Sequence, residues 1–311
     1  MRKGITIAAA LCLLAASLLT GCTSADAGKQ AITVGSKIDT EGALLANMMI
    51  LLLTDAEIDV VDRSSFGPTQ IVREALLSGE IDVYPEYTGN GAFFFDMTDS
   101  DVWNDAEQGY QTVAELDLQE NGVVWLQPAP ANNTWAIAVP QALAEDENLD
   151  TLEDFADYVN DGGYVKLAAS EEFVTSPVAL PAFEEAYGFD LSEDQLLTLS
   201  GGNTAQTEQA AAQGTDGVNA AMAYGTDGSL SALDLVVLED PLGAQPIYQP
   251  APIVRGEVYQ NYPEMSDILD PVFKTLTLET LQTLNARIAL EGEDPGLVAG
   301  DYLRTEGFLA S

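Results

Sequence analysis

The chain has 311 residues, and its 50 acidic and 11 basic side chains give a formal net charge of −39. Such a surface makes nucleic acid and anionic membranes poor partners. The acids are scattered along the chain, which indicates a generally acidic surface whose self-repulsion salt would screen. Histidine is absent, which removes Ser-His-Asp and Cys-His catalysis and histidine zinc sites. The absence of histidine therefore argues against an enzyme, although paired carboxylates could still act.

The N-terminus has the pattern of an export signal. A short basic region precedes an apolar run at residues 5–19, which is too short to span a bilayer comfortably. The following Gly21-Cys22 resembles the lipobox of secreted lipoproteins, although a plain secretory signal with an incidental cysteine would look similar. We predict a lipoprotein signal peptide over residues 1–22, lipidation at Cys22 and a tether over residues 23–30. The protein would then lie in the periplasm or on the outer face of the membrane, held only by its lipid anchor.

The first part of the folded region alternates predicted strands and helices. Pro68 opens a helix at its first turn and Gly79 ends it, because these residues suit those two positions. In chain order the predicted elements are a strand at 31–35, a helix at 43–53, a strand at 58–61, a helix at 68–79, a strand at 81–84, a helix at 99–118, and strands at 123–126 and 136–139. This order with short connections predicts a mostly parallel sheet covered by helices.

The alternation then restarts in a second block. Its predicted elements are a helix at 151–159, a strand at 164–168, helices at 178–187 and 205–213, strands at 218–223 and 235–238, a proline-rich passage to 253–254, and helices over 262–290 and 295–306. We infer that the chain crosses twice between two α/β lobes. Lobe I is predicted to comprise residues 31–133 and 227–311, and lobe II residues 134–226.

Four polar and aromatic segments follow predicted strands or lie at the predicted crossings. They are residues 35–42, 84–90, 132–135 and 224–228. Ligands of open α/β sheets bind at the ends of strands, so these segments would line one cleft between the lobes. Aromatic faces can hold a quaternary ammonium cation there. The shared rings, amides and hydroxyls suit a small molecule that carries a cation, and they include no pair of nucleophile and base.

Further motifs agree with a known family. Besides the four segments, they lie at residues 92–95, 166–170, 180–183, 217–224 and 245–248. With them the chain resembles, over essentially its whole mature length, the substrate-binding proteins of osmoprotectant ABC importers of the OsmF/YehZ type. These importers take up glycine betaine, choline, carnitine and related quaternary amines. The resemblance implies a two-lobed type II periplasmic-binding-protein fold with the ligand cleft between its lobes, and an ABC permease and ATPase as partners. We expect no cofactor and no metal.

The resemblance also assigns candidate ligand-binding residues. The family holds the trimethylammonium group in a box of aromatic rings, and matching by motif implies that Tyr87, Trp135 and Tyr224 supply rings of this box. Asn133 matches a polar contact of the choline-type members. Asn90, which ends the segment of Tyr87, is a further candidate.

A ligand carboxylate would need a cation or N–H donors. Lys37 lies in a cleft segment, backbone amides at the start of the following helix are equally good donors, and Arg255 is a weaker candidate. Other residues near these segments have structural explanations. Tyr84 is expected in the core, Glu86 as a solvated group or loop brace, and Asp227 as a brace that accepts backbone N–H bonds.

Two departures from the choline-type members bear on the ligand. Gly42 stands where they often carry glutamine, and residues 201–207 contain no aromatic where they carry a further tyrosine. Losing one desolvated cation–π contact would weaken binding roughly ten- to thirtyfold. We therefore predict a low-affinity receptor for glycine betaine or a related quaternary amine. Choline, carnitine or another small amine, a sensing module without transport, and a secreted hydrolase that uses Glu86 with another carboxylate are the alternatives.

Overall fold

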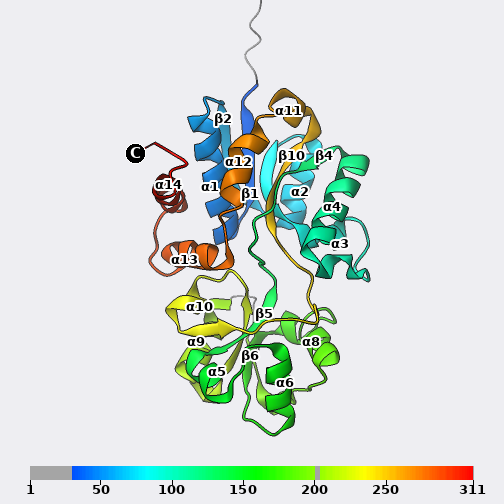
Figure 1. The fold of residues 1–311 in the computed structure, drawn as a ribbon, viewed down its shortest axis with the longest axis vertical. Helices are drawn as coiled ribbons and strands as arrows, with labels where there is room; N and C mark the ends of the chain where they lie inside the picture. The colour runs from blue at the N-terminus through cyan, green and yellow to red at the C-terminus, as the bar shows by residue number, and fades with distance from the viewer. Residues whose placement is uncertain (1–29, 200–203, 311) are drawn as a thin grey trace, which may run out of the picture. The chain divides into compact units, whose positions relative to one another are not determined.

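The computed structural model describes residues 30–199 and 204–310. The predicted signal peptide, the predicted lipidation site Cys22 and nearly all of the predicted tether lie outside these residues. Residues 31–311 form one compact unit. This unit contains two mixed five-stranded sheets with helices on their faces, which confirms the predicted α/β class (Figure 1).

The first sheet has the order β2-β1-β3-β10-β4. Its strands are β1 (Ile32–Lys37), β2 (Val60–Gly67), β3 (Val83–Tyr87), β4 (Val123–Trp125) and β10 (Pro250–Arg255). Strand β1 pairs in parallel with β2 and β3, whereas β10 runs antiparallel to both β3 and β4. Strand β4 therefore runs in the same direction as β1, β2 and β3, so the sheet is mostly parallel as predicted, and β10 alone makes it mixed.

Strand β10 is the exception to the predicted pattern. It is a central strand, yet it carries Pro250 and Pro252, which cannot donate to a ladder and so argue against a central strand. Its prolines contribute carbonyls instead: Pro252 accepts a hydrogen bond from Leu126 N at 2.9 Å, and Pro250 accepts one from Ala129 N at 2.8 Å.

The second sheet has the order β7-β6-β8-β5-β9. Its strands are β5 (Trp135–Pro140), β6 (Leu167–Ser170), β7 (Leu196–Leu199), β8 (Ala220–Tyr224) and β9 (Leu235–Val237). Strand β7 is an edge strand that the sequence analysis missed. Strand β9 pairs with β5, so the chain leaves this sheet after Val237 and not at the predicted lobe boundary at residue 227.

Six of the helices, namely α1, α4, α6, α7, α13 and α14, begin at side-chain caps. Asp39 caps α1 by accepting a hydrogen bond from Gly42 N at 2.6 Å, and Thr277 divides the predicted helical stretch 262–290 by capping α13. The helices are α1 (Thr40–Asp55), α2 (Thr69–Ser78), α3 (Gly91–Phe94), α4 (Ala106–Asn121), α5 (Gln141–Glu147), α6 (Leu152–Asn160), α7 (Glu171–Thr175), α8 (Leu180–Tyr187), α9 (Thr204–Gln213), α10 (Ser229–Ala232), α11 (Gly256–Asn261), α12 (Met265–Phe273), α13 (Leu278–Ala289) and α14 (Pro295–Thr305).

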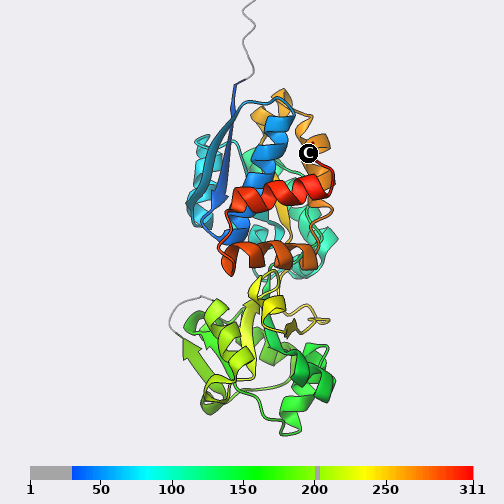
Figure 2. The same ribbon diagram turned by 90° about the vertical axis from the view of Figure 1, so that its left-hand side faces the viewer.

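Separate apolar clusters support the two sheets. Residues of α1, α12, α13 and α14 pack on one face of the first sheet, and Figure 2 shows α13 and α14 against α1. Residues of α2 and α4 together with Trp103 pack on its other face. Another cluster joins β5, β6 and β8 to α6, α7 and α8. Each sheet therefore has a core of its own, and the segments that link the sheets are left to form the site.

Candidate functional site

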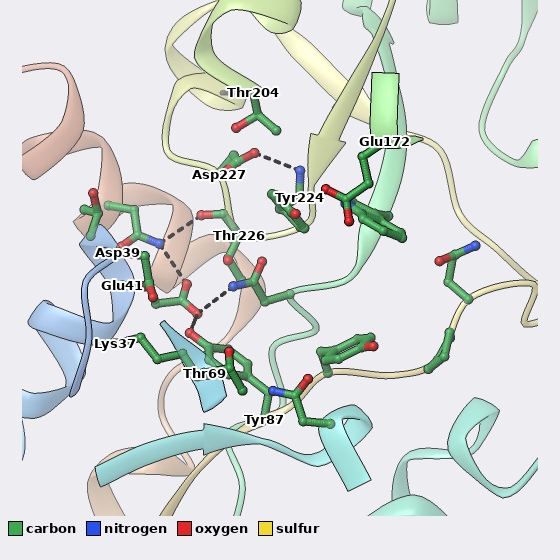
Figure 3. A pocket seen from close by; sticks show the side chains of 18 of the residues that line it. Lys37, Asp39, Glu41, Thr69, Tyr87, Glu172, Thr204, Tyr224, Thr226 and Asp227 are labelled. Atoms are coloured by element: carbon green, nitrogen blue, oxygen red, sulfur yellow. Dashed lines mark hydrogen bonds between the residues drawn. The ribbon is translucent and has the colours of Figure 1, made fainter. Parts of the chain in front are cut away.

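A cavity of about 830 Å³ lies where segments from both sheets meet (Figure 3). All six residues predicted to contact a ligand line it: Lys37, Tyr87, Asn90, Asn133, Trp135 and Tyr224. Their positions follow from the strands, because Lys37, Tyr87 and Tyr224 end β1, β3 and β8, while Trp135 begins β5. Their contact with a ligand stays a prediction.

Trp135 and Tyr224 form one wall of the cavity. They are opposite each other in the antiparallel pair β5–β8, and their rings stack with centroids 6.4 Å apart and an interplanar angle of 25°. Phe173 supports Trp135 edge-on at 6.0 Å. The loop beyond Tyr224 is held by Asp227, whose carboxylate accepts a hydrogen bond from Tyr224 N at 2.7 Å. This confirms the bracing role predicted for Asp227.

The close approach of backbones at this junction requires glycine. A Cβ atom at Gly228 would lie 2.1 Å from Ala286 N in α13, and one at Gly225 would lie 2.2 Å from Asn132 O. Both partners are backbone atoms that cannot move aside alone. The glycines of segment 224–228 therefore let the loop after β8 lie directly against α13 and the crossing at residue 132.

Tyr87 is more enclosed than the other predicted rings. Its hydroxyl donates a hydrogen bond to Glu41 at 2.7 Å, and burial raises the pKa of Tyr87 well above its usual value. The ammonium of Lys37 lies 4.4 Å from the centroid of the Tyr87 ring. A cation of the protein therefore already occupies one face of this ring.

Lys37 and Asn90 line the cavity, but both bond to Glu86. The Lys37 ammonium lies 2.5 Å from a Glu86 oxygen, and the Asn90 amide donates to the same oxygen at 2.7 Å. Glu86 is fully buried and also accepts hydrogen bonds from Tyr84 OH at 2.7 Å and from Tyr87 N at 2.8 Å. Glu86 is thus a buried loop brace and not a solvated group, and Tyr84 is a core residue as predicted.

Arg255, the weaker candidate for a ligand carboxylate, does not line this cavity. Its guanidinium pairs with Asp82 at 2.9 Å and with Glu257 at 3.2 Å. The strand register explains why Arg255 lies outside the cavity, because Arg255 ends β10 opposite Val123 at the start of β4. The prediction for Arg255 is therefore wrong for this cavity.

The sequence analysis missed Glu41, a buried acid in the first turn of α1. Its oxygens accept hydrogen bonds from Tyr87 OH at 2.7 Å, from the Asn133 amide at 3.1 Å and from the Asn285 amide at 2.8 Å. Burial raises its pKa. Glu41 thereby ties α1 to a crossing segment and to α13. Its position in segment 35–42 was visible in the sequence, but its partners lie 46 to 244 residues away.

Tyr248 is a further ring that the sequence analysis did not assign. It lies on the passage between β9 and β10, where Tyr248 N donates to the Asn132 side chain at 2.8 Å and Tyr248 O accepts from Asn133 N at 2.9 Å. Burial raises the pKa of Tyr248 to about 12. Its ring packs against Gly89, where a Cβ atom would lie 2.9 Å from ring carbons. Residues 245–248 belong to the motifs that carry the family resemblance, but they predicted no ligand contact for Tyr248.

The region of the predicted missing ring reaches the cavity. Thr204 and Ala205 at the start of α9 line it, while residues 200–203 lie outside the described part of the chain. One turn further along α9, Glu208 is fully buried. Burial and the charge of Asp227 together raise the pKa of Glu208 to about 9. This shift favours the protonated form of Glu208 at neutral pH, next to the Asp227 carboxylate that braces the Tyr224 loop.

Comparisons with known proteins agree with one another. Residues 30–305 match the family described as the substrate binding domain of ABC-type glycine betaine transport systems. The glycine betaine-binding protein YehZ of Escherichia coli K12 is 56% identical over 277 residues, which cover 89% of this chain and 91% of that protein. A glycine-betaine-binding protein of Pseudomonas aeruginosa is 32% identical over 307 residues, covering 96% of this chain and 94% of the relative.

A solved structure extends the comparison to the fold. Apo YehZ from Escherichia coli superposes with a TM-score of 0.84 at 55% identity, covering 90% of this chain and all of that chain. The resemblance and the periplasmic-binding-protein fold drawn from the sequence are thereby confirmed. Within the described residues, no helix is long and apolar enough to cross a membrane.

Proposed function

Since the chain belongs to the family of substrate-binding proteins of ABC-type glycine betaine transport systems, we propose that it is an extracytoplasmic receptor that delivers glycine betaine or a related quaternary amine to such an importer. The observation that carries this proposal is the stacked Trp135–Tyr224 pair, which faces one cavity together with Tyr87 and Tyr248. Ring faces attract a trimethylammonium group, which cannot itself donate hydrogen bonds.

The same rings support a low affinity. Lys37 lies over Tyr87 and competes with a ligand cation for that face, and the start of α9 presents Thr204 and Ala205 in place of a ring. Each missing desolvated contact weakens binding by about tenfold or somewhat more. Tyr248 compensates in part, since its motif brings a further ring to the cavity.

The remaining assignments concern partners and location. We propose that the receptor works with an ABC permease and ATPase and is anchored through a lipid on Cys22, with the lobes closing on the ligand to form the surface that the permease recognises. The cavity is lined by rings, amides, hydroxyls and carboxylates, and it lacks histidine because the whole chain does. This lining supports binding without catalysis.

Thermal-shift and calorimetric titrations in high salt test the proposal. Glycine betaine, choline and carnitine would be compared, with the expectation that at least one stabilises the protein at millimolar concentration. Tyr224→Ala should abolish the shift, whereas Tyr164→Ala, which removes an exposed ring outside the cavity, should leave it unchanged. A folded protein that none of these amines stabilises would overturn the proposed function, and binding at sub-micromolar concentration would overturn the low affinity.

A further inference from the structure

The lining of the cavity is strongly acidic. Besides Lys37, the charged residues that line it in the described part of the chain are Asp39, Glu41, Glu172 and Asp227. Figure 3 shows Glu172 beside Tyr224 on one side and Glu41 near Tyr87 on the other. The acids therefore surround the rings from both lobes.

Lys37 does not offset these four acids. Its ammonium is 2.5 Å from Glu86, both side chains are at least nine-tenths buried, and the pair is neutral as a unit. Glu41 accepts hydrogen bonds from neutral donors, which are the Tyr87 hydroxyl and the amides of Asn133 and Asn285. Glu41 thus has no protein cation within hydrogen-bond distance in the described residues, and its burial raises its pKa.

A carboxylate on the ligand would find poor partners in this lining. Two donors of the lining, the Gln245 amide nitrogen and the Trp135 indole nitrogen, are buried without a hydrogen-bond partner among the described residues and could donate to such a group. A neutral amide donor satisfies one oxygen but does not cancel the repulsion of nearby acids. The lining thus attracts the cationic end of a zwitterion and repels its carboxylate end.

We propose that this cavity selects its ligand by net charge, so that a quaternary amine with a net positive charge binds more tightly than a zwitterion with the same trimethylammonium group. Glu172, which lines the cavity from α7, supplies the countercharge. The inference rests on the proposed function, because it concerns which quaternary amine the same rings hold. The inference predicts that choline binds more tightly than glycine betaine.

The two ligands make a matched pair. Choline and glycine betaine share the trimethylammonium group and differ at the other end, where choline has a hydroxyl and betaine a carboxylate. A ligand carboxylate about 4 Å from a negative unit charge of the protein is repelled by it, which lowers the affinity roughly fivefold even in bulk water. The loss is larger where water is partly excluded. We expect choline to bind at least about fivefold more tightly at low salt, with a smaller ratio in high salt.

Calorimetric titration of the wild-type protein with both ligands tests the inference at about 50 mM salt. Glu172→Gln should lower the ratio of choline to betaine affinity about two- to fivefold. Glu171→Gln is the matched control, because Glu171 is the exposed neighbour in the same turn of α7, removes the same charge and does not line the cavity.

The outcomes separate this inference from the proposed function. If the folded wild-type protein binds neither ligand, the proposed function fails. If betaine binds as tightly as choline or more tightly, the function stands and selection by net charge is overturned. If Glu172→Gln and Glu171→Gln change the ratio equally, Glu172 is not a selectivity residue, and the effect belongs to the acidic surface as a whole.

Discussion

Replacing Glu208 with glutamine should stabilise the protein at neutral pH. Glu208 is fully buried in α9, where burial and then the charge of Asp227 raise its pKa to about 9. In the unfolded chain the same group titrates near 4.5. The folded state therefore binds this proton more tightly, so the stabilising contribution is complete below about pH 4.5 and is lost as the pH rises through about 9.

The magnitude follows from this difference in pKa. Each pH unit above the unfolded pKa costs the folded state about 1.4 kcal/mol until the folded-state pKa is reached, which gives roughly 4 kcal/mol at pH 7.5. Glutamine resembles the protonated acid and avoids this loss, but it adds an N–H that lacks a partner and costs about 1–3 kcal/mol. We expect Glu208→Gln to gain about 1–3 kcal/mol at pH 7.5.

Chemical denaturation of the variant and the wild type from about pH 5 to about pH 9, at fixed high salt, measures this gain. The difference in free energy of unfolding should be small or unfavourable at the acidic end and should grow towards the alkaline end. Glu185→Gln controls for the lost charge, since Glu185 is exposed in α8, and its difference should stay nearly constant. A Glu208→Gln difference that is independent of pH, or that grows towards acid, would refute the reasoning.

Three further changes test other parts of the structure. Arg73→Met removes the bidentate partner of Asp117, at 2.5 and 2.8 Å, and leaves a buried carboxylate unpaired, so a loss of about 3–5 kcal/mol in denaturation experiments is expected; a loss below about 1 kcal/mol would contradict this. Glu41→Ala leaves the Tyr87 hydroxyl and the Asn133 amide without an acceptor and removes one of the two acceptors of the Asn285 amide, so it should lower the free energy of unfolding by about 2–5 kcal/mol, whereas an unchanged value would show that water replaces the carboxylate. Gly228→Ala would place its Cβ 2.1 Å from the backbone of Ala286, so the melting temperature and any ligand-induced shift should both fall, and unaltered values would mean that the loop can move away from α13.

Much of the fold was readable from local patterns. The turn signals Pro68 and Gly79 do bound α2, and alternating strands and helices predicted the α/β class. The pattern failed where pairing between distant segments overrides local preference. Strand β10 is central in spite of two prolines, and β9 belongs to the second sheet because it pairs with β5.

The site was predictable to a similar extent. Tyr87, Trp135 and Tyr224 belong to motifs at strand ends, where ligands of α/β sheets bind. Tyr87 comes from the first sheet and the other two from the second, and all three line one cavity. Lys37 was recognised as a cleft residue, but its pairing with Glu86 across 49 residues was not visible. Glu41 and Tyr248 were missed because their roles depend on partners far away in the chain.

The sequence by itself determined the absence of histidine, the acidic charge, the α/β class and the family, since these follow from composition and from motifs that are contiguous in the chain. Only the tertiary structure decided which of the cleft residues are already satisfied by the protein. Hydrogen bonds and ion pairs form between atoms within about 3 Å, whatever their separation in sequence. Whether Lys37 is free, or Glu41 is buried, is therefore a property of the assembled fold and not of any segment.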